Sequence, residues 1–322
     1  MSYLRLVVLV LTLFVNSLRG LWELSILKNT FIVDIGKKGD GEMVRFYCPV
    51  PEETSVFWRA KGNKRNGRNL KTLVREAMDA GNFTCHLSNG DIEDYKVLLI
   101  HKYNVSLNEK ILSNSKQPVE CEAKNYSGHF RCSWLGTKTD VVYVFEAQRG
   151  GYTIHCENPL RREHNKYEVN CQDNESCQYG EESQYIEVVL HAVQEKRYEN
   201  HTQVFMLRDI TKPDPPSDLK KSGKNSNVSL NWKYPKTWCN IHSFFPLIFN
   251  VNITKENKGA PELHKDIEVP QLTLKHKGKL TFCVQARDMY YKSSWSEWTC
   301  SMHNKSRKKH KKKRPEKSPK RS

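Results

Sequence analysis

Three stretches decide the fold of this 322-residue chain: VRFYC at residues 44–48, VFW at residues 56–58 and DAGNFTC at residues 79–85. In the first stretch every second residue is apolar, and Val56 and Trp58 repeat that spacing. A strand with this period has one face in the protein core and the other in solvent. Turn residues separate the stretches, as they do in all-β sandwiches. The first third of the chain therefore predicts an all-β sandwich.

The spacing of two cysteines and a tryptophan indicates which sandwich this is. Cys48 and Cys85 bracket Trp58, and the second cysteine ends the pattern D-x-G-x-F-x-C. An inter-sheet disulfide packed on a tryptophan, with an aromatic residue two positions before the second cysteine, is the immunoglobulin core pattern. Phe83 stands where tyrosine is usual, so the corner loses its hydroxyl hydrogen bond although the ring can still pack. We expect an immunoglobulin-like C2-type domain over residues 21–105 with a Cys48–Cys85 disulfide.

The first twenty residues have the layout of a secretory signal. Arg5 precedes an apolar run at residues 6–15, and small or polar residues continue to Gly20. The apolar run of about ten residues is too short for a membrane span, which needs about twenty. We expect a signal peptide at residues 1–20, a mature chain from Leu21, and a soluble, secreted, extracellular protein without a membrane span.

Sequons for N-glycosylation support the extracellular assignment, because the eight N-x-S/T triplets exceed what composition gives by chance. We expect glycans at seven of them: Asn82, Asn104, Asn174, Asn200, Asn227, Asn252 and Asn304.

The net charge of +16 is concentrated at the C-terminus. Residues 305–322 hold eleven Lys or Arg and one Glu, which gives +10 and leaves +6 for the rest of the chain. Such a segment, low in apolar residues, is expected to be disordered over residues 304–322. Dense positive charge attracts polyanions. One hypothesis is therefore that residues 305–321 bind heparin-like glycosaminoglycan; the alternative is a solvated tail.

Residues 106–211 form a second strand-rich block with five cysteines. Pairing Cys121 with Cys132 and Cys156 with Cys171 requires only neighbouring strands. Cys177 then remains, as an intermolecular bridge, a reactive thiol or a buried free thiol. Structural zinc sites place two to four residues between paired cysteines, whereas the closest pair here has five, so a disulfide framework without metal is favoured.

A proline-rich linker, KPDPP at residues 212–216, opens a third block. Alternation returns in VSLNW at residues 228–232 and continues to the end of the block, which predicts a third sandwich over residues 212–303. A hairpin can bring Cys283 opposite Cys300, which leaves Cys239 free or capped. No stretch predicts a helix of any length.

Three features of the later blocks resemble the class I cytokine receptors: Cys121…Cys132-Ser133-Trp134, the proline-rich linker, and WSEWT at residues 295–299. The resemblance implies two fibronectin type III domains, at residues 106–211 and 212–303. The last motif is similar to the family's W-S-x-W-S, with Thr299 in place of the final serine. In that family its tryptophans stack with cations from a neighbouring strand. Arg287 is the expected partner of this structural motif, which comprises Trp295, Ser296, Glu297, Trp298 and Thr299.

A secreted member of that family, with an immunoglobulin domain in front, implies a more specific function. The stretches LWEL at 21–24, EAKNYSG at 122–128 and SSWSEW at 293–298 resemble receptor-like subunits that clasp a four-helix-bundle cytokine alpha subunit at the elbow between the second and third domains. The resulting heterodimer signals through cell-surface class I cytokine receptors in immunity.

The resemblance also implies the contact residues, namely Tyr126, Glu181, Phe244, Asp288 and Tyr290, with Cys177 forming the inter-subunit disulfide. Phe244 stands where tyrosine is expected, so it lacks the hydroxyl. Aromatic residues supply contact area, and Asp288 can pair with a partner arginine. The alternative is that Asp288 ends a strand and Tyr290 packs locally. Asn125 adjoins Tyr126 and is expected to carry no glycan.

The sequence also bears on two other classes of function. An enzyme is not expected, because the sequence has no H-E-x-x-H, no G-x-S-x-G and no phosphate-binding glycine loop, and we expect no cofactor. The second is a soluble receptor or decoy that captures a cytokine reversibly. Cys177 separates the two readings, because a covalent partner indicates a subunit whereas a free or internally paired thiol leaves the decoy open.

Overall fold

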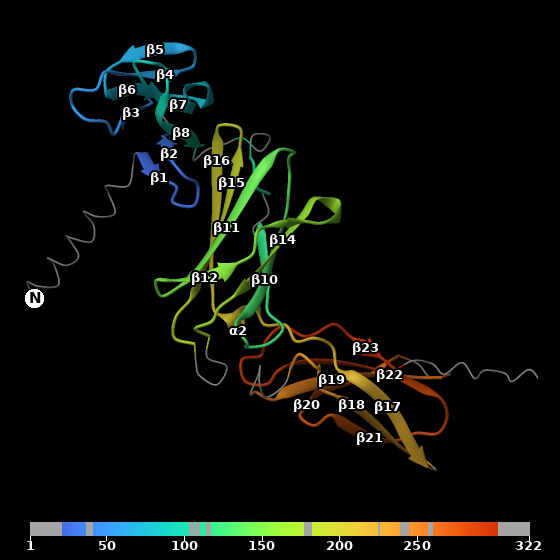
Figure 1. Ribbon diagram of the computed structural model, residues 1–322. Helices are drawn as coiled ribbons and strands as arrows, with labels where there is room; N and C mark the ends of the chain where they lie inside the picture. Colours follow the sequence, from blue (N-terminus) through green and yellow to red (C-terminus); the bar gives the residue numbers. More distant parts are fainter. Residues whose placement is uncertain are drawn as a thin grey trace, which may run out of the picture. The chain divides into compact units, whose positions relative to one another are not determined.

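In a computed structural model the regular secondary structure of the described residues is almost entirely β-strand, as the sequence predicts (Figure 1). The structure describes residues 21–36, 41–102, 106, 110–113, 117–176, 182–224, 226–238, 245–256 and 260–301. The expected signal peptide, the basic tail and Cys239 lie outside these residues. The chain consists of two compact units, Met1–Thr211 and Lys212–Ser322. No helix in the described residues is long and apolar enough to cross a membrane.

The first sandwich has two sheets. The larger sheet runs β5-β4-β7-β8, where β8 also pairs with β2 and β2 with β1, and the second sheet consists of the paired strands β3 and β6. The strands are β1 (Leu21–Glu23), β2 (Thr30–Ile35), β3 (Glu42–Tyr47), β4 (Val56–Ala60), β5 (Asn63–Asn66), β6 (Asn69–Val74), β7 (Gly81–Leu87) and β8 (Ile92–Lys102).

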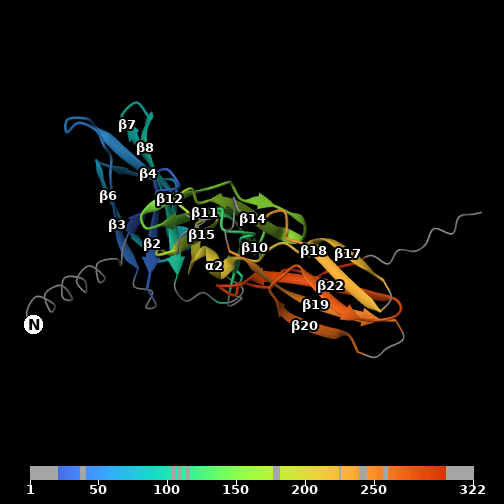
Figure 2. The ribbon, with the colours of Figure 1, turned by 90° about the horizontal axis from the view of Figure 1, so that it is seen from below.

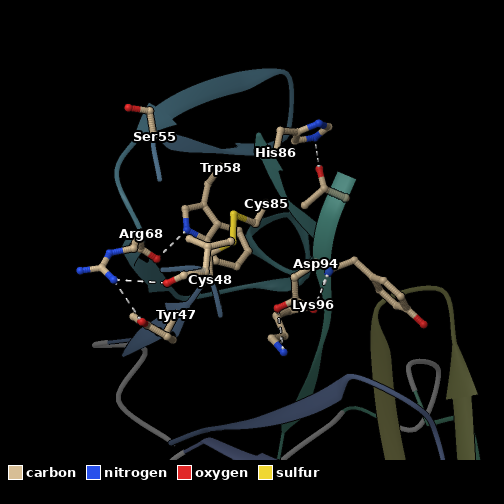
Figure 3. Close-up of a disulfide and its surroundings, with 12 residues drawn as sticks. Tyr47, Cys48, Ser55, Trp58, Arg68, Cys85, His86, Asp94 and Lys96 are labelled. Atoms are coloured by element: carbon tan, nitrogen blue, oxygen red, sulfur yellow. Dashed lines mark hydrogen bonds and ion pairs between the residues drawn. A yellow bond between two sulfur atoms is a disulfide. The ribbon is translucent and has the colours of Figure 1, made fainter. Parts of the chain in front are cut away.

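A disulfide and a tryptophan join the two sheets, as Figure 3 shows. Cys48 follows β3 and is bonded to Cys85 on β7. Trp58 is fully buried beside this bond, and its Nε1 donates to the Arg68 carbonyl at 3.0 Å. Phe83 is buried in the same core, so the ring packs without the missing hydroxyl.

The second sandwich is formed by β9 to β16. One sheet contains β9, β10 and β14, with β13 beside β14; the other contains β11, β15 and β16; and β12 pairs with β11 and then with β14. Their bounds are β9 (Val119–Glu122), β10 (His129–Leu135), β11 (Val141–Arg149), β12 (Tyr152–Cys156), β13 (Leu160–Arg161), β14 (Lys166–Gln172), β15 (Ile186–Gln194) and β16 (Arg197–Phe205), followed by the short helix α2 (Leu207–Ile210).

Two disulfides of this sandwich join residues that face each other on adjacent strands. Cys132 is opposite Cys121, and Cys156 is opposite Cys171. These are the two pairings expected from the sequence. They fasten β9 and β12 to the sheet that carries Trp134 in its core.

The first and second sandwiches share a small core. Strand β16 pairs in parallel with β8, which places Tyr198 opposite His101. The Tyr198 ring is buried with Ile32 and Leu99, and Trp22 meets it edge-on at a centroid distance of 5.6 Å. The two sandwiches are therefore parts of one packed unit.

The third sandwich also has two sheets, seen in Figure 2 with β17 and β18 above β22, β19 and β20. Its strands are β17 (Ser217–Lys224), β18 (Asn227–Lys233), β19 (Leu247–Lys255), β20 (Glu262–Ile267), β21 (Gln271–Lys275), β22 (Leu280–Asp288) and β23 (Thr299–Cys300). Trp232, Phe249 and Phe282 fill its core. Cys283 and Cys300 are opposite each other on β22 and β23 and form the expected disulfide.

Candidate partner-binding site

The predicted contact residues fall on both units. Tyr126 lies in the loop between β9 and β10, whereas Asp288 ends β22 and Tyr290 follows it. Cys177, Glu181 and Phe244 lie outside the described residues.

A buried ion cluster holds both ends of the segment that carries Cys177 and Glu181. Arg149, the last residue of β11, is only 8% exposed. Its Nε lies 2.7 Å from Oδ2 of Asp173, and its Nη2 lies 3.0 Å from Oε1 of Glu182. Arg149 Nη1 also donates to the Gln184 carbonyl at 3.1 Å. One guanidinium therefore ties the chain before residue 177 to the chain after residue 181.

The same cluster extends to α2. The Glu182 carboxylate accepts hydrogen bonds from the backbone N–H groups of Leu207 and Arg208, at 2.8 and 3.0 Å. The first N–H groups of a helix have no partner within the helix, so a carboxylate at this end stabilises it. Glu182 thus links the segment after residue 181 to the helix that precedes the linker.

The loop that carries Tyr126 packs against this cluster. The backbone N–H of Asp173 donates to the Gly128 carbonyl at 3.0 Å, and Gln172 Nε2 donates to the Ser127 carbonyl at 3.2 Å. The Ala123 N–H, at the start of the loop, donates to Ile210 O at 3.0 Å. Three segments that are distant in sequence therefore meet at one end of the second sandwich.

Tyr126 itself is mostly enclosed, with 4% of its surface exposed. Little of its surface is therefore free to contact a partner, and its contact role stays a prediction. The neighbouring Asn125 is also buried, and its Oδ1 accepts from the Ser127 N–H at 3.0 Å. This burial supports the expectation that Asn125 carries no glycan.

The remaining sequons differ in exposure. Asn82, Asn174, Asn200 and Asn227 are exposed, and Asn252 is half-buried. Asn104 and Asn304 lie outside the described residues. Glycan occupancy at these positions stays a prediction.

In the third sandwich, Asp288 organises the turn after β22. Its side chain is fully buried, and Oδ1 accepts from the N–H groups of Tyr290 and Tyr291 at 2.7 and 2.8 Å. Its own N–H donates to Ser293 Oγ at 3.0 Å. The strand-ending role considered as the alternative is therefore present in this chain. Pairing of Asp288 with a partner arginine stays a prediction.

The turn that Asp288 organises displays an aromatic surface. Tyr290 is 64% exposed, and its ring meets Phe245 edge-on at a centroid distance of 5.9 Å. Phe245 also contacts the Tyr291 ring at 5.3 Å. The family resemblance implies Phe244 as a contact and does not include Phe245, whose signal in the sequence is its position next to Phe244.

The motif at residues 295–299 supports the fold. The Arg287 guanidinium carbon lies 4.5 Å from the centre of the Trp295 ring, so the expected cation–π contact is confirmed. Ser296 donates its N–H to the Ala286 carbonyl, and its Oγ accepts from the Ala286 N–H. These hydrogen bonds hold the segment at residues 295–299 alongside β22 at the edge of the sheet.

Arg149 and Glu182 were not anticipated from sequence, although β11 carries a signal for the first. Its buried positions are Tyr143, Phe145, Ala147 and Arg149, so the period of two places an arginine on the inner face. Among the described residues, no group of three or more His, Cys, Asp or Glu is arranged to hold a metal ion.

Comparison with known proteins covers most of the chain. Residues 116–194, from just before β9 to the end of β15, match the family model described as "Cytokine interleukin-12p40 C-terminus". The chain is 38% identical to the interleukin-12 subunit beta of Bos taurus and 37% identical to those of Ovis aries and Felis catus. Each match extends over 314 residues and covers 89% of this chain and 94% of the relative.

Proposed function

Because the chain belongs to the interleukin-12 subunit beta family, we propose that it is secreted as the receptor-like subunit of a heterodimeric, interleukin-12/23-like cytokine in immunity. Its partner is a four-helix-bundle alpha subunit, and the pair signals through cell-surface class I cytokine receptors. The family consists of cytokine subunits, so the chain is a cytokine subunit and not an enzyme.

The observation that most supports this proposal is the cluster around Arg149. The loop with Tyr126, the chain on both sides of residues 177–181, and α2 are held at one end of the second sandwich. A contact surface built from separate segments needs such a rigid support, because a partner then binds without a further cost of ordering it.

The third sandwich contributes aromatic area. An exposed tyrosine whose ring is held by neighbouring aromatic rings loses little freedom on binding, and such residues dominate binding energy at protein interfaces. Tyr290, against Phe245, has this character. Phe244 and Glu181 would complete the contacts, and Cys177 would form a disulfide with the alpha subunit.

Electrophoresis of the protein secreted by its native cells, with and without reductant, tests the proposal. We expect a heavier species that separates on reduction, and mass mapping should find Cys177 joined to a helical cytokine chain. A Cys177→Ser variant should secrete the two chains without the covalent link, while Cys239→Ser serves as the control. If Cys177 is free, or paired within this chain, the reversible decoy becomes the better account.

The basic tail is a separate part of the proposal. We propose that residues 305–321 retain the secreted protein on heparin-like glycosaminoglycan. Truncation after His303 should lower the salt concentration at which the protein leaves a heparin column. Unchanged retention at moderate salt would mean that the tail is only solvated.

A further inference from the structure

An unbalanced run of positive charge lies within the first sandwich. Residues 54–75 contain seven Lys or Arg and neither Asp nor Glu. This +7 exceeds the +6 that remains for the whole chain once the tail at residues 305–322 is set aside. Outside the tail, the net positive charge therefore arises from one continuous stretch through β4, β5 and β6.

Four cations gather on the outer face of the two-stranded β3–β6 sheet and beside its β6 strand. Arg45 is directly opposite Lys71, and both are exposed. Arg65 Nη1 donates to the Lys71 carbonyl at 3.0 Å, which holds its guanidinium beside β6. The Arg68 guanidinium lies 5.8 Å from the centre of the Tyr47 ring (Figure 3). These five residues are called the basic face below.

Little negative charge balances the basic face. Within the described residues, Arg68 has an acidic neighbour, Glu52, at 3.4 Å, but the Glu52 side chain is 89% exposed. Arg45, Arg65 and Lys71 form no ion pair with any described residue, although Lys61 on the same stretch pairs with Asp79 at 2.9 Å. Like charges directly opposite on a sheet are destabilising. The face therefore keeps most of its positive charge unbalanced, which favours the approach of an anion.

The chemistry of the face favours a polysaccharide over a protein. Stable protein interfaces bury about 800 Å² per partner and have a centre depleted in charge. Here the charged Arg45–Lys71 pair occupies the centre, while the apolar Met43–Leu73 pair lies at one end of the strands. A sulfated chain instead carries anionic groups along its length and needs only a flat row of cations.

We propose that the basic face binds sulfated glycosaminoglycan, independently of the C-terminal tail. The guanidinium groups of Arg45, Arg65 and Arg68 donate to sulfate oxygens, and Lys71 adds a fourth charge. Tyr47 keeps Arg68 over its ring and so fixes the edge of the face.

The test uses the full-length chain with the eleven cations of residues 305–321 replaced by glutamine, so that the tail contributes no charge. In this background, a triple variant changes Arg45, Arg65 and Lys71 to glutamine; Arg68 is kept because its Nη1 donates to the Val50 carbonyl. The matched control changes three exposed lysines of the third sandwich, Lys221, Lys275 and Lys277, to glutamine. Affinity for a heparin dodecasaccharide is measured at several salt concentrations.

We expect the triple variant to lose about tenfold in affinity at physiological salt and to show a weaker salt dependence, because fewer counterions are exchanged. The control should change by less than about twofold. Equal losses in both variants, or no loss in either, would overturn the proposal.

Two further measurements keep the result interpretable. Heparin should protect Lys71 of the unmodified protein from acetylation but leave Lys221 reactive, which tests the face without any substitution. Unprotected Lys71 would refute the proposal. It would also fail if the triple variant kept its heparin affinity but lost binding to a class I receptor ectodomain, since that result identifies the face as a protein contact.

Discussion

Arg149 lies where a charged residue is least expected, on the buried face of β11. Its environment explains its presence, because Asp173 and Glu182 both lie within 3.0 Å of the guanidinium. Removing one member of a buried ion cluster leaves the others without compensation and costs about 3–5 kcal/mol. The stability of the candidate site therefore depends on this one side chain.

Replacing Arg149 with methionine should lower the free energy of unfolding by about 3–5 kcal/mol, because two carboxylates remain buried. Urea unfolding measures the change. Arg162→Met is the matched control: Arg162 pairs with Glu168 at 3.0 Å, but its side chain is 54% exposed, so its loss should cost less than about 1 kcal/mol. Similar costs for the two variants would contradict a buried cluster.

Residues with a fixed geometric requirement could be predicted from sequence. The Cys48–Cys85 bond around Trp58 and the contact of Arg287 with Trp295 follow from spacing or from a known motif. Arg149 could not be assigned a role, because its acidic partners are 24 and 33 residues further along the chain and nothing local marks them.

At the scale of elements, the loop between β9 and β10 depends on one glycine. Gly128 has a φ of +85°, and a Cβ there would lie 2.1 Å from the Asp173 carbonyl oxygen. Only a residue without a side chain allows the loop to approach Asp173 closely enough for the hydrogen bond between them. The position of Tyr126 thus follows from a close contact between two backbones.

A Gly128→Ala variant should lose more stability than Gly151→Ala, which is a matched control. Gly151 has a similar φ of +88°, but nothing lies within 4 Å of its Cβ position. The control should cost about 1–2 kcal/mol from backbone strain alone, and Gly128→Ala about 1–3 kcal/mol more from the clash. Urea unfolding gives both values, and equal costs would exclude the close approach. The yield of disulfide-linked heterodimer should fall only for Gly128→Ala.

Strands were the most predictable elements, because alternation in stretches such as residues 44–48 and 228–232 marks their buried faces. Neighbouring strands could also be predicted from the sequence, so three disulfides between adjacent strands could be paired correctly. The parallel pairing of β16 with β8 was not, because these strands are separated by most of the second sandwich and parallel contacts leave no turn signal.

At the scale of the whole molecule, the joint between the first two sandwiches contains a titratable group. His191 is buried on β15, with Nδ1 at 2.7 Å from the Tyr198 hydroxyl and Nε2 at 3.1 Å from Glu146 Oε2. Burial lowers the pKa of His191 below its usual 6.5, although Glu146 opposes this. Burial also raises the pKa of Tyr198 to about 12, so the tyrosine remains neutral at physiological pH.

Because its folded pKa is lowered, His191 binds a proton more readily in the unfolded chain. Its contribution to stability is therefore present above pH 6.5 and is lost as pH falls through 6.5 toward the folded pKa. We expect the free energy of unfolding to decrease between pH 7.5 and 5.5, by at most about 1.4 kcal/mol per pH unit for this proton.

Urea unfolding at both pH values checks this expectation, and His191→Gln should reduce the slope. Burial also lowers the pKa of His201, so a smaller slope of the same sign should remain. If the free energy of unfolding of the glutamine variant changes with pH as steeply as that of the unmodified protein, His191 does not contribute to the pH dependence.

The shared core between β8 and β16 also has a consequence for how the protein is made. Ile32 and Leu99 are both translated long before Tyr198, the residue that covers them. While the nascent chain emerges from the ribosome, the first sandwich can form its core around the Cys48–Cys85 disulfide. It cannot yet bury the apolar surface of Ile32 and Leu99, because Tyr198 has not been synthesised. For about one hundred residues of elongation this apolar surface is exposed to chaperones and to other nascent chains. The first sandwich can therefore finish folding only after Tyr198, in the second sandwich, has been synthesised.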